Sequence, residues 1–208
     1  MPVAQGVGGC QTAAVGGGEA IEVAGIVLTG GRAVRFQGVD KASIEIAGAT
    51  LLEHALGALA EVPDVVVVGD EVLTSRPVGF VREDPPGGGP AAGVLAGLAG
   101  FPRAPRFVAV LAVDMPLVTS ATLSRLLLSA DDDGALLVDE DGRRQYLCAI
   151  YRVASLQDAA PPLEDQHGLS MRRLVADLRL AEVPALPGEA RDVDTWDDLA
   201  ELRDRLGG

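Results

Sequence analysis

Residues 28–41, LTGGRAVRFQGVDK, have the residue types of an anion-binding loop. Gly30-Gly31 follows a short apolar run, and glycines let the backbone approach a ligand closely. Their amides can form a nest for a base or for phosphates. Arg32, Arg35 and Lys41 add three cations in a chain whose net charge is −13. The alternative is an ordinary turn with solvated arginines. The segment matches neither G-x-G-x-x-G nor G-x-x-x-x-G-K-[ST], which argues against a dinucleotide site or a P-loop.

Lys41 is the only lysine among the 17 Lys and Arg residues of the chain. Either one lysine survived by chance, or this position requires a compact ammonium rather than a guanidinium fork.

Three aspartates are candidates for a Mg²⁺ site. Asp114 comes directly after the apolar run 107–113, and a carboxylate at the end of a central strand is well placed to hold Mg²⁺. The alternative for Asp114 is a capping or turn role. Asp192 and Asp194 precede Thr195, which is expected to cap the last helix. Capping does not require either of these two aspartates, so one of them is free to reach the metal.

Residues 83–93, EDPPGGGPAAG, form a second glycine-rich segment. Its prolines and glycines exclude a helix or a central strand over 84–90 and predict a loop. Glu83 or Asp84 is a candidate acceptor of hydrogen bonds from a base or a ribose. Gly93 is expected to open a helix end toward a ligand. The alternative is a flexible surface loop.

Buried strands and helices alternate around these residues. Apolar runs predict strands, whereas helical periodicity and capping residues predict helices. The expected strands are 24–29, 65–68, 80–81, 107–113, 135–138, 145–151 and 180–183, where 135–138 and 145–151 form a hairpin or a pair of edge strands. The expected helices are 51–60 after a capping box at Thr50, 91–99, 120–130, 171–178 and 196–206.

This alternation is typical of βαβ units. It predicts a single-domain, three-layer αβα fold with an open, mostly parallel, Rossmann-like sheet. Ligands of such sheets bind at the carboxyl ends of the strands, so Gly30-Gly31, residues 84–90 and Asp114 should gather at that edge. Residues 1–20 are rich in Gly and Ala and are predicted to be a disordered leader, which leaves 21–208 as the domain.

Composition excludes several function classes. A net charge of −13 argues against binding to a nucleic-acid backbone. No apolar stretch reaches the roughly 18 residues of a membrane span, and the N-terminus lacks the pattern of a signal peptide. Cys10 and Cys148 have no metal-type spacing and fit a reducing compartment. We therefore expect a cytoplasmic protein with neither membrane nor nucleic acid as a partner.

Together these segments resemble the molybdenum-cofactor guanylyltransferase family and its cytidylyltransferase relatives. The family signature L-x-G-G-x-x-x-R-x-G-x-D-K resembles the pattern of Leu28, Gly30, Gly31, Arg35, Gly38, Asp40 and Lys41, where the usual pattern is tighter by one residue, Gln37. PPGGGPAAG is similar to the family's second glycine loop, 113–116 to its metal motif, and 192–199 to its last helix start. Residues 145–151 and 167–174 are similar to its acceptor side.

The resemblance implies a nucleotidyltransferase that moves GMP from GTP to the terminal phosphate of Mo-molybdopterin, with Mg²⁺ as cofactor and pyrophosphate as product. Lys41 and Arg35 would hold the triphosphate. Asp114 would bind Mg²⁺ with Asp192 or Asp194. Ser170 and Arg172 are expected to face the pterin. The implied nucleotide contacts are Leu28, Thr29, Gly30, Gly31, Arg32, Lys41, Glu83, Asp84, Gly89 and Asp114.

Three residues depart from the family pattern, namely Phe36, Gln37 and Trp196, and they bear on base selectivity more than on catalysis. The alternatives are a cytidylyltransferase for the same cofactor, a transferase for another small acceptor, or a non-catalytic nucleotide-binding module. A cofactor-modifying enzyme must hand on its product, so transient contact with molybdoenzymes or their chaperones is expected. The expected assembly is a monomer or weak oligomer.

Overall fold

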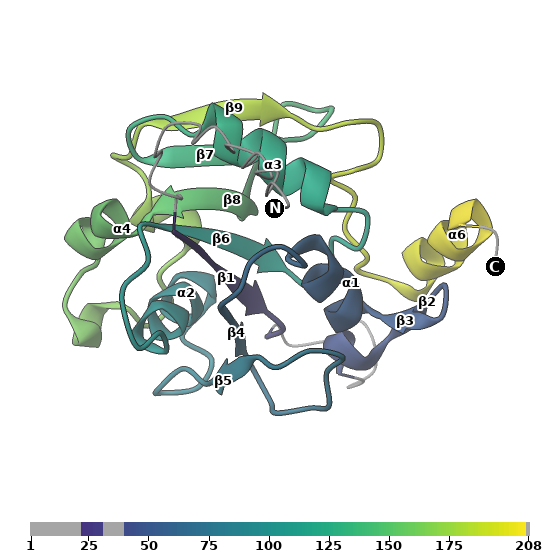
Figure 1. Ribbon diagram of the computed structural model, residues 1–208, viewed down its shortest axis with the longest axis horizontal. Helices are drawn as coiled ribbons and strands as arrows, with labels where there is room; N and C mark the ends of the chain where they lie inside the picture. Colours follow the sequence, from purple (N-terminus) through teal and green to yellow (C-terminus); the bar gives the residue numbers. More distant parts are fainter. Residues whose placement is uncertain (1–21, 31–39, 207–208) are drawn as a thin grey trace, which may run out of the picture.

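The computed structural model describes residues 22–30 and 40–206 (Figure 1). The predicted leader, residues 1–20, lies outside this part of the chain. So do Gly31, Arg32 and Arg35 of the first glycine loop and the departures at Phe36 and Gln37.

A seven-stranded sheet forms the centre of the described fold (Figure 1). Its order is β5-β4-β1-β6-β8-β7-β9, and only β8 runs antiparallel to its neighbours. The open, mostly parallel sheet that the alternation predicts is therefore confirmed. The strands are β1 (Val23–Leu28), β4 (Val65–Val68), β5 (Gly79–Val81), β6 (Phe107–Ala112), β7 (Gly134–Val138), β8 (Arg144–Arg152) and β9 (Leu180–Pro184).

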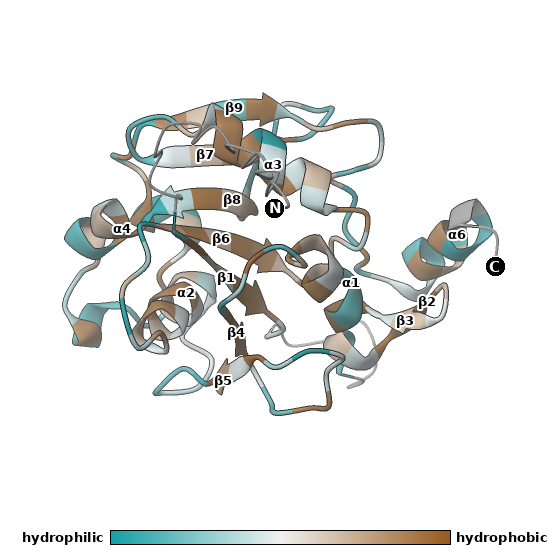
Figure 2. Cartoon of the chain, viewed as in Figure 1, coloured by the Kyte–Doolittle hydropathy of each residue, from teal (hydrophilic) through white to brown (hydrophobic). Residues whose placement is uncertain are grey.

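Helices cover both faces of this sheet, and successive side chains of β1 pack into the two different cores beneath them. Val27 packs into the core beneath α1 (Leu51–Ala58) and α3 (Ser120–Ser129). Ile26 and Leu28 point to the opposite face, into the core beneath α2 (Pro90–Ala99), α4 (Val153–Ala159) and α5 (Met171–Leu174). Successive residues of a strand face opposite sides, so one apolar run supplies two cores. Figure 2 shows the apolar central strands between the helices.

A small unit stands beside the sheet (Figure 1). The hairpin of β2 (Glu45–Ile46) and β3 (Ala49–Thr50) follows the short 3₁₀ turn η2 (Lys41–Ser43) and contacts α6 (Trp196–Leu206). The guanidinium of Arg203 donates a hydrogen bond of 2.7 Å to the carbonyl of Glu45. This unit joins the segment that carries Lys41 to the helix that follows Asp194.

Several elements differ from their predicted form. The helix expected over 171–178 ends at Leu174, because Val175 leaves the helical conformation (φ −101°, ψ 17°). The capping box at Thr50 is half formed: its hydroxyl accepts from the amide of Glu53, whereas the carboxylate of Glu53 accepts from Ser75. Residues 135–138 and 145–151 form a hairpin, and β9 takes the sheet edge. The sequence predicted neither the β2–β3 hairpin nor α4.

No helix within residues 22–30 and 40–206 has the length and apolar character needed to cross a membrane.

Candidate functional site

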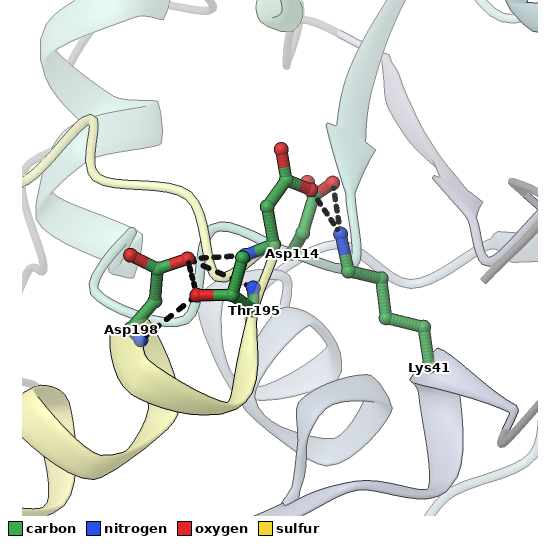
Figure 3. Close-up of polar contacts among 5 residues, drawn as sticks. Lys41, Asp114, Thr195 and Asp198 are labelled. Carbon is green, nitrogen blue, oxygen red and sulfur yellow. Dashed lines mark hydrogen bonds and ion pairs between the residues drawn. The ribbon is translucent and has the colours of Figure 1, made fainter. Parts of the chain in front are cut away.

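Lys41 reaches two carboxylates that come from distant parts of the chain. Its Nζ donates to Oδ2 of Asp114 at 3.0 Å and to Oδ1 of Asp194 at 2.8 Å. Figure 3 shows the ammonium of Lys41 directed toward Asp114. The side chain of Lys41 is 13% exposed, against 28% for Asp114 and 43% for Asp194. The lysine is therefore the covered member of the cluster, and the carboxylates face outward.

Backbone hydrogen bonds place both aspartates at the carboxyl edge of the sheet. Asp114 follows β6, and the amide of Val113 donates to the carbonyl of Leu28 at the end of β1 (3.0 Å). The amide of Val193 donates to the carbonyl of Asp114 (2.8 Å). This hydrogen bond holds the segment that carries Asp194 beside Asp114, just after the end of β6.

The cap of α6 fixes the backbone of Asp194. Oδ2 of Asp198 accepts from the amide of Asp194 (3.1 Å), the amide of Thr195 (2.8 Å) and the hydroxyl of Thr195 (2.7 Å). The amide of Asp198 donates to Oγ1 of Thr195 (3.1 Å), which closes a reciprocal cap (Figure 3). The hydrogen bond from the Thr195 hydroxyl is the main cause that lowers the pKa of Asp198. The cap at Thr195 is confirmed, and it also orients a site residue.

The charges of this cluster shift two pKa values. Burial would lower the pKa of Lys41, but attraction and hydrogen bonds from Asp114 and Asp194 outweigh it, so the pKa is raised. The lysine is an ammonium at neutral pH. Burial, and then repulsion by Asp114 and Asp194, raise the pKa of Asp192. Asp192 thus lies within electrostatic range of the same two carboxylates.

The donor set fits Mg²⁺ bound together with substrate oxygens. No group of three His, Cys, Asp or Glu side chains in the described residues is arranged to hold a metal ion. Asp114 and Asp194 nevertheless direct oxygens at one common cation, the Lys41 ammonium. Mg²⁺ is commonly bound by one or two carboxylates plus substrate phosphates rather than by a complete protein cage. These two aspartates match that incomplete set.

The residues at the end of β1 have distinct surroundings. Leu28 is buried, and the hydroxyl of Thr29 donates to the carbonyl of Val68 at 3.0 Å, which ties β1 to β4. Gly30 is exposed, and a Cβ built on it would meet nothing within 4 Å. Gly30 therefore borders open space at this edge, whereas the side chains of Leu28 and Thr29 are used within the fold.

The second glycine loop lies between β5 and α2. Oε2 of Glu83 accepts from the amide of Gly88 at 2.7 Å, whereas Asp84 is exposed. Gly89 has a φ of 90° and precedes the first helical residue, a conformation that favours glycine. Gly93, expected to open a helix end toward a ligand, instead packs against Leu28: a Cβ on it would come within 3.2 Å of Cδ2.

The expected acceptor side meets this loop. The amide of Gly168 donates to the carbonyl of Gly88 at 2.7 Å. Ser170 caps α5 by accepting from Arg173, and Arg172 is exposed. A cavity of about 380 Å³ lies between α2 and residues 157–167, with Glu83 among its lining residues. None of the described hydrogen bonds joins the glycine loop to the Lys41 cluster, and the end of β1 lies between them.

One supporting network was missed by sequence reasoning. The buried carboxylate of Glu189 accepts from Thr122, from the amide of Leu186 and twice from Arg125. It anchors to α3 the segment that leads to Asp192 and Asp194. Glu189 lies in an aperiodic stretch after β9, and no spacing or motif distinguishes it from a solvated glutamate.

Comparison with known proteins decides the family. Residues 25–183 match the model of the MobA-like NTP transferase domain. The chain belongs to this family. It is 37% identical over 193 residues to the probable molybdenum cofactor guanylyltransferase of Opitutus terrae, covering 88% of this chain and 94% of the relative. It is 33% identical over 165 residues to the Mycobacterium tuberculosis protein of the same name, covering 76% and 80%.

Solved structures share the fold of this MobA-like NTP transferase. Molybdopterin-guanine dinucleotide biosynthesis protein A from Archaeoglobus fulgidus superposes with a TM-score of 0.68 at 24% identity, over 88% of this chain and 98% of the other. The 2-C-methyl-D-erythritol 4-phosphate cytidylyltransferase from Thermus thermophilus gives 0.65 at 21%, over 90% and 100%. The predicted nucleotidyltransferase-type fold is confirmed. The family match contains Lys41 and Asp114 but ends before Asp194.

Proposed function

We propose that this MobA-like NTP transferase moves GMP from GTP to the terminal phosphate of Mo-molybdopterin. The names of the curated relatives support the guanylyl group and the molybdenum cofactor. The observation that carries the proposal is the Lys41 ammonium held between Asp114 and Asp194 at the carboxyl edge of the sheet. A cation and two converging carboxylates at this edge suit a nucleoside triphosphate bound with Mg²⁺.

The reaction would be one in-line displacement. An oxygen of the acceptor phosphate forms a bond to the α-phosphorus of GTP, the bond from that phosphorus to its bridging oxygen breaks, and pyrophosphate leaves. The acceptor phosphate is already ionised at neutral pH, so no general base is required. Catalysis of this kind rests on positioning and on neutralising charge.

Each site residue then has a role under this proposal. Lys41, with Arg35 and Arg32, would bind the triphosphate, and Leu28, Gly30 and Gly31 would lie against the nucleotide. Asp114 and Asp194 would bind Mg²⁺, with Asp192 adding negative charge nearby. When bound, Mg²⁺ supplies a counter-charge for the phosphate oxygens and the leaving pyrophosphate. Ser170 and Arg172 would face the acceptor.

Ligand-dependent melting of the purified protein tests the proposal first. GTP, CTP, ATP and UTP are each added with Mg²⁺, and a selective rise in Tm with GTP is expected. The second step measures formation of the guanine dinucleotide and pyrophosphate from GTP and Mo-molybdopterin. Selective stabilisation and turnover with CTP would replace guanylyl with cytidylyl transfer. Nucleotide binding with no transfer to Mo-molybdopterin would contradict the proposed acceptor.

A further inference from the structure

Both backbone polar groups of Gly88, the amide and the carbonyl, form hydrogen bonds. Its amide donates to Oε2 of Glu83 at 2.7 Å, and its carbonyl accepts from the amide of Gly168 at 2.7 Å. Gly88 is buried, although Gly87 and Pro86 beside it are exposed. The loop is therefore fixed at one residue, by a side chain two residues after β5 and by the backbone of the segment that leads to α5.

The carboxylate of Glu83 is directed at the loop and at α2. A Cβ built on Gly93 would lie 3.0 Å from Oε1 of Glu83, and one on Gly88 would lie 3.6 Å from Oε2. The same Gly93 position is 3.2 Å from Cδ2 of Leu28. Glu83 thus fills the space between the glycine loop, the first turn of α2 and the end of β1.

This placement has an electrostatic consequence for the bound nucleotide. The first turn of a helix favours negative charge, and Glu83 supplies it for α2. A carboxylate there would repel phosphate groups and would favour a triphosphate bound at the other end of the edge, where Lys41 lies. The glycine loop would then contact the base and ribose side of the nucleotide.

A loop with three consecutive glycines also needs an anchor to hold one shape. Gly87 and Gly89 both have positive φ values, 79° and 90°, and glycine loses more freedom on ordering than any other residue. A charge-assisted hydrogen bond from a fixed side chain offsets part of that cost before substrate arrives. Binding to a loop that is already ordered is tighter, because less conformational freedom is lost.

We propose that Glu83 is a positioning residue, which holds the glycine loop through the Gly88 amide and does not itself bind the nucleotide. The inference rests on the proposed function. The Gly168 contact places the carbonyl of the same residue against the expected acceptor segment. Loss of the Glu83 anchor therefore loosens the contact surfaces for both substrates.

Three substitutions of Glu83 distinguish the effects of its side-chain length, its charge and its hydrogen bond to Gly88. Glu83→Ala removes the acceptor atom, and Glu83→Asp keeps the charge but is one methylene shorter. Glu83→Gln keeps the length and an oxygen that can accept from Gly88. Glu61→Ala is the matched control, because Glu61 is exposed at the opposite edge of the sheet, just before β4.

The expected kinetics follow from the anchor. In Glu83→Ala and Glu83→Asp, KM for GTP rises roughly 10-fold, about 1.4 kcal/mol of binding, while kcat changes less than about threefold. Glu83→Gln recovers KM to within about threefold of wild type. The ratio of kcat/KM for GTP to that for CTP stays constant in all variants. Hydrogen exchange over residues 84–93 speeds up in Glu83→Ala and Glu83→Asp, and not in Glu83→Gln or Glu61→Ala.

Other results would overturn the assignment. A changed GTP-to-CTP ratio would make Glu83 a direct ligand of the nucleotide, and so would a Gln variant as impaired as the Ala variant with unchanged hydrogen exchange over residues 84–93. If the kinetics and hydrogen exchange of Glu83→Ala and Glu83→Asp match those of Glu61→Ala, Glu83 does not anchor the loop. If Glu83→Ala does not fold, comparison of Glu83→Asp with Glu83→Gln still tests whether Glu83 acts as the anchor. Wild-type protein that neither binds GTP nor transfers GMP would refute the proposed function itself.

Discussion

Lys41 provides the positive charge that the surrounding carboxylates require, whether or not a substrate is bound. Asp114 and Asp194 converge on it, and Asp192 adds a third negative charge within range. Such a cluster repels itself unless a positive charge sits among its members. Lys41 supplies that charge in the chain itself, and the same ammonium is within reach of a phosphate that enters the cluster.

Replacement of Lys41 tests this role most directly. Lys41→Ala is expected to lower kcat/KM by roughly 100-fold, about 2.7 kcal/mol of transition-state stabilisation, because a contact to the triphosphate is lost. Pyrophosphate release from GTP measures it, and circular dichroism checks the fold. Lys41→Arg is the companion variant and should recover only part of the activity, since a fork does not replace a compact ammonium. Turnover near that of wild type in Lys41→Ala would refute the role.

Asp114→Asn tests the metal assignment. An amide is a weaker ligand for Mg²⁺ than a carboxylate, so the Mg²⁺ concentration for half-maximal rate should rise by an order of magnitude or more. Asp64→Asn is the control, because Asp64 is exposed at the opposite edge of the sheet, directly before β4. Activity is measured across a Mg²⁺ titration. Superimposable titrations of wild type and Asp114→Asn would remove Asp114 from the metal site.

Sequence reasoning located Asp114 but left Asp192 and Asp194 as alternatives. Asp114 could be predicted because it directly follows an apolar strand, and the carboxyl ends of strands form the ligand-binding edge in such folds. The hydrogen bond from Lys41 to Asp194 spans 153 residues, and no local period encodes a contact of that range. The structure pairs Lys41 with Asp194, and Asp192 is the residue whose pKa burial raises.

At the scale of elements, glycines in two helices have different surroundings, because one faces the sheet and the other is exposed. In α2, a Cβ on Gly97 would come within 2.9 Å of Cδ1 of Ile26. In α1, a Cβ on Gly57 would meet nothing within 4 Å. The same amino acid therefore has a packing role in one helix and none in the other.

These two glycines form a matched pair of tests. Gly57→Ala should stabilise the protein by about 0.5–1 kcal/mol, because alanine loses less freedom in a helix. Gly97→Ala should destabilise it by roughly 1–3 kcal/mol, because α2 must move away from β1. Urea unfolding of both variants measures the difference. Equal effects of the two substitutions would show that α2 does not pack on β1 as described.

The elements that the sequence predicts are those with a strong local signal. VVVV and FVAVLAV are long apolar runs, and β4 and β6 occupy them. The β2–β3 hairpin has only two residues per strand, and α4 has seven residues and no side-chain cap. Such short elements form because the sheet and α6 hold them, so propensity alone does not reveal them.

At the scale of the whole molecule, the segment after β9 crosses from the sheet edge to the site and needs a fixed point. Glu189 provides it by linking this segment to α3 through Thr122 and Arg125. The side chain of Glu189 is 7% exposed, and all of its described partners donate hydrogen bonds to it. A single buried carboxylate therefore connects a helix on one face of the sheet to the backbone that carries Asp194.

The charge of Glu189 makes the stability of this connection depend on pH. Burial would raise the pKa of Glu189, but hydrogen bonds from Arg125, Thr122 and the Leu186 amide outweigh it and lower the pKa below its ordinary value. In the unfolded chain a glutamate titrates near ~4.3. Because the pKa of Glu189 is lower in the folded protein, its carboxylate contributes its full stabilisation above the pKa of the unfolded chain. The contribution is lost as the pH falls through the folded pKa.

Glu189→Gln isolates this contribution from the other carboxylates. Asp133 and Asp198 also have lowered pKa values and give both proteins the same acid sensitivity. At pH 7 the variant should be less stable by ~2 kcal/mol, because the carboxylate that pairs with Arg125 is replaced by a neutral amide. That gap should narrow below pH ~4.3, as Glu189 becomes protonated in the wild type. Urea unfolding between pH 7 and pH 3 measures both curves, and a gap that stays constant would show that Glu189 does not act through its charge.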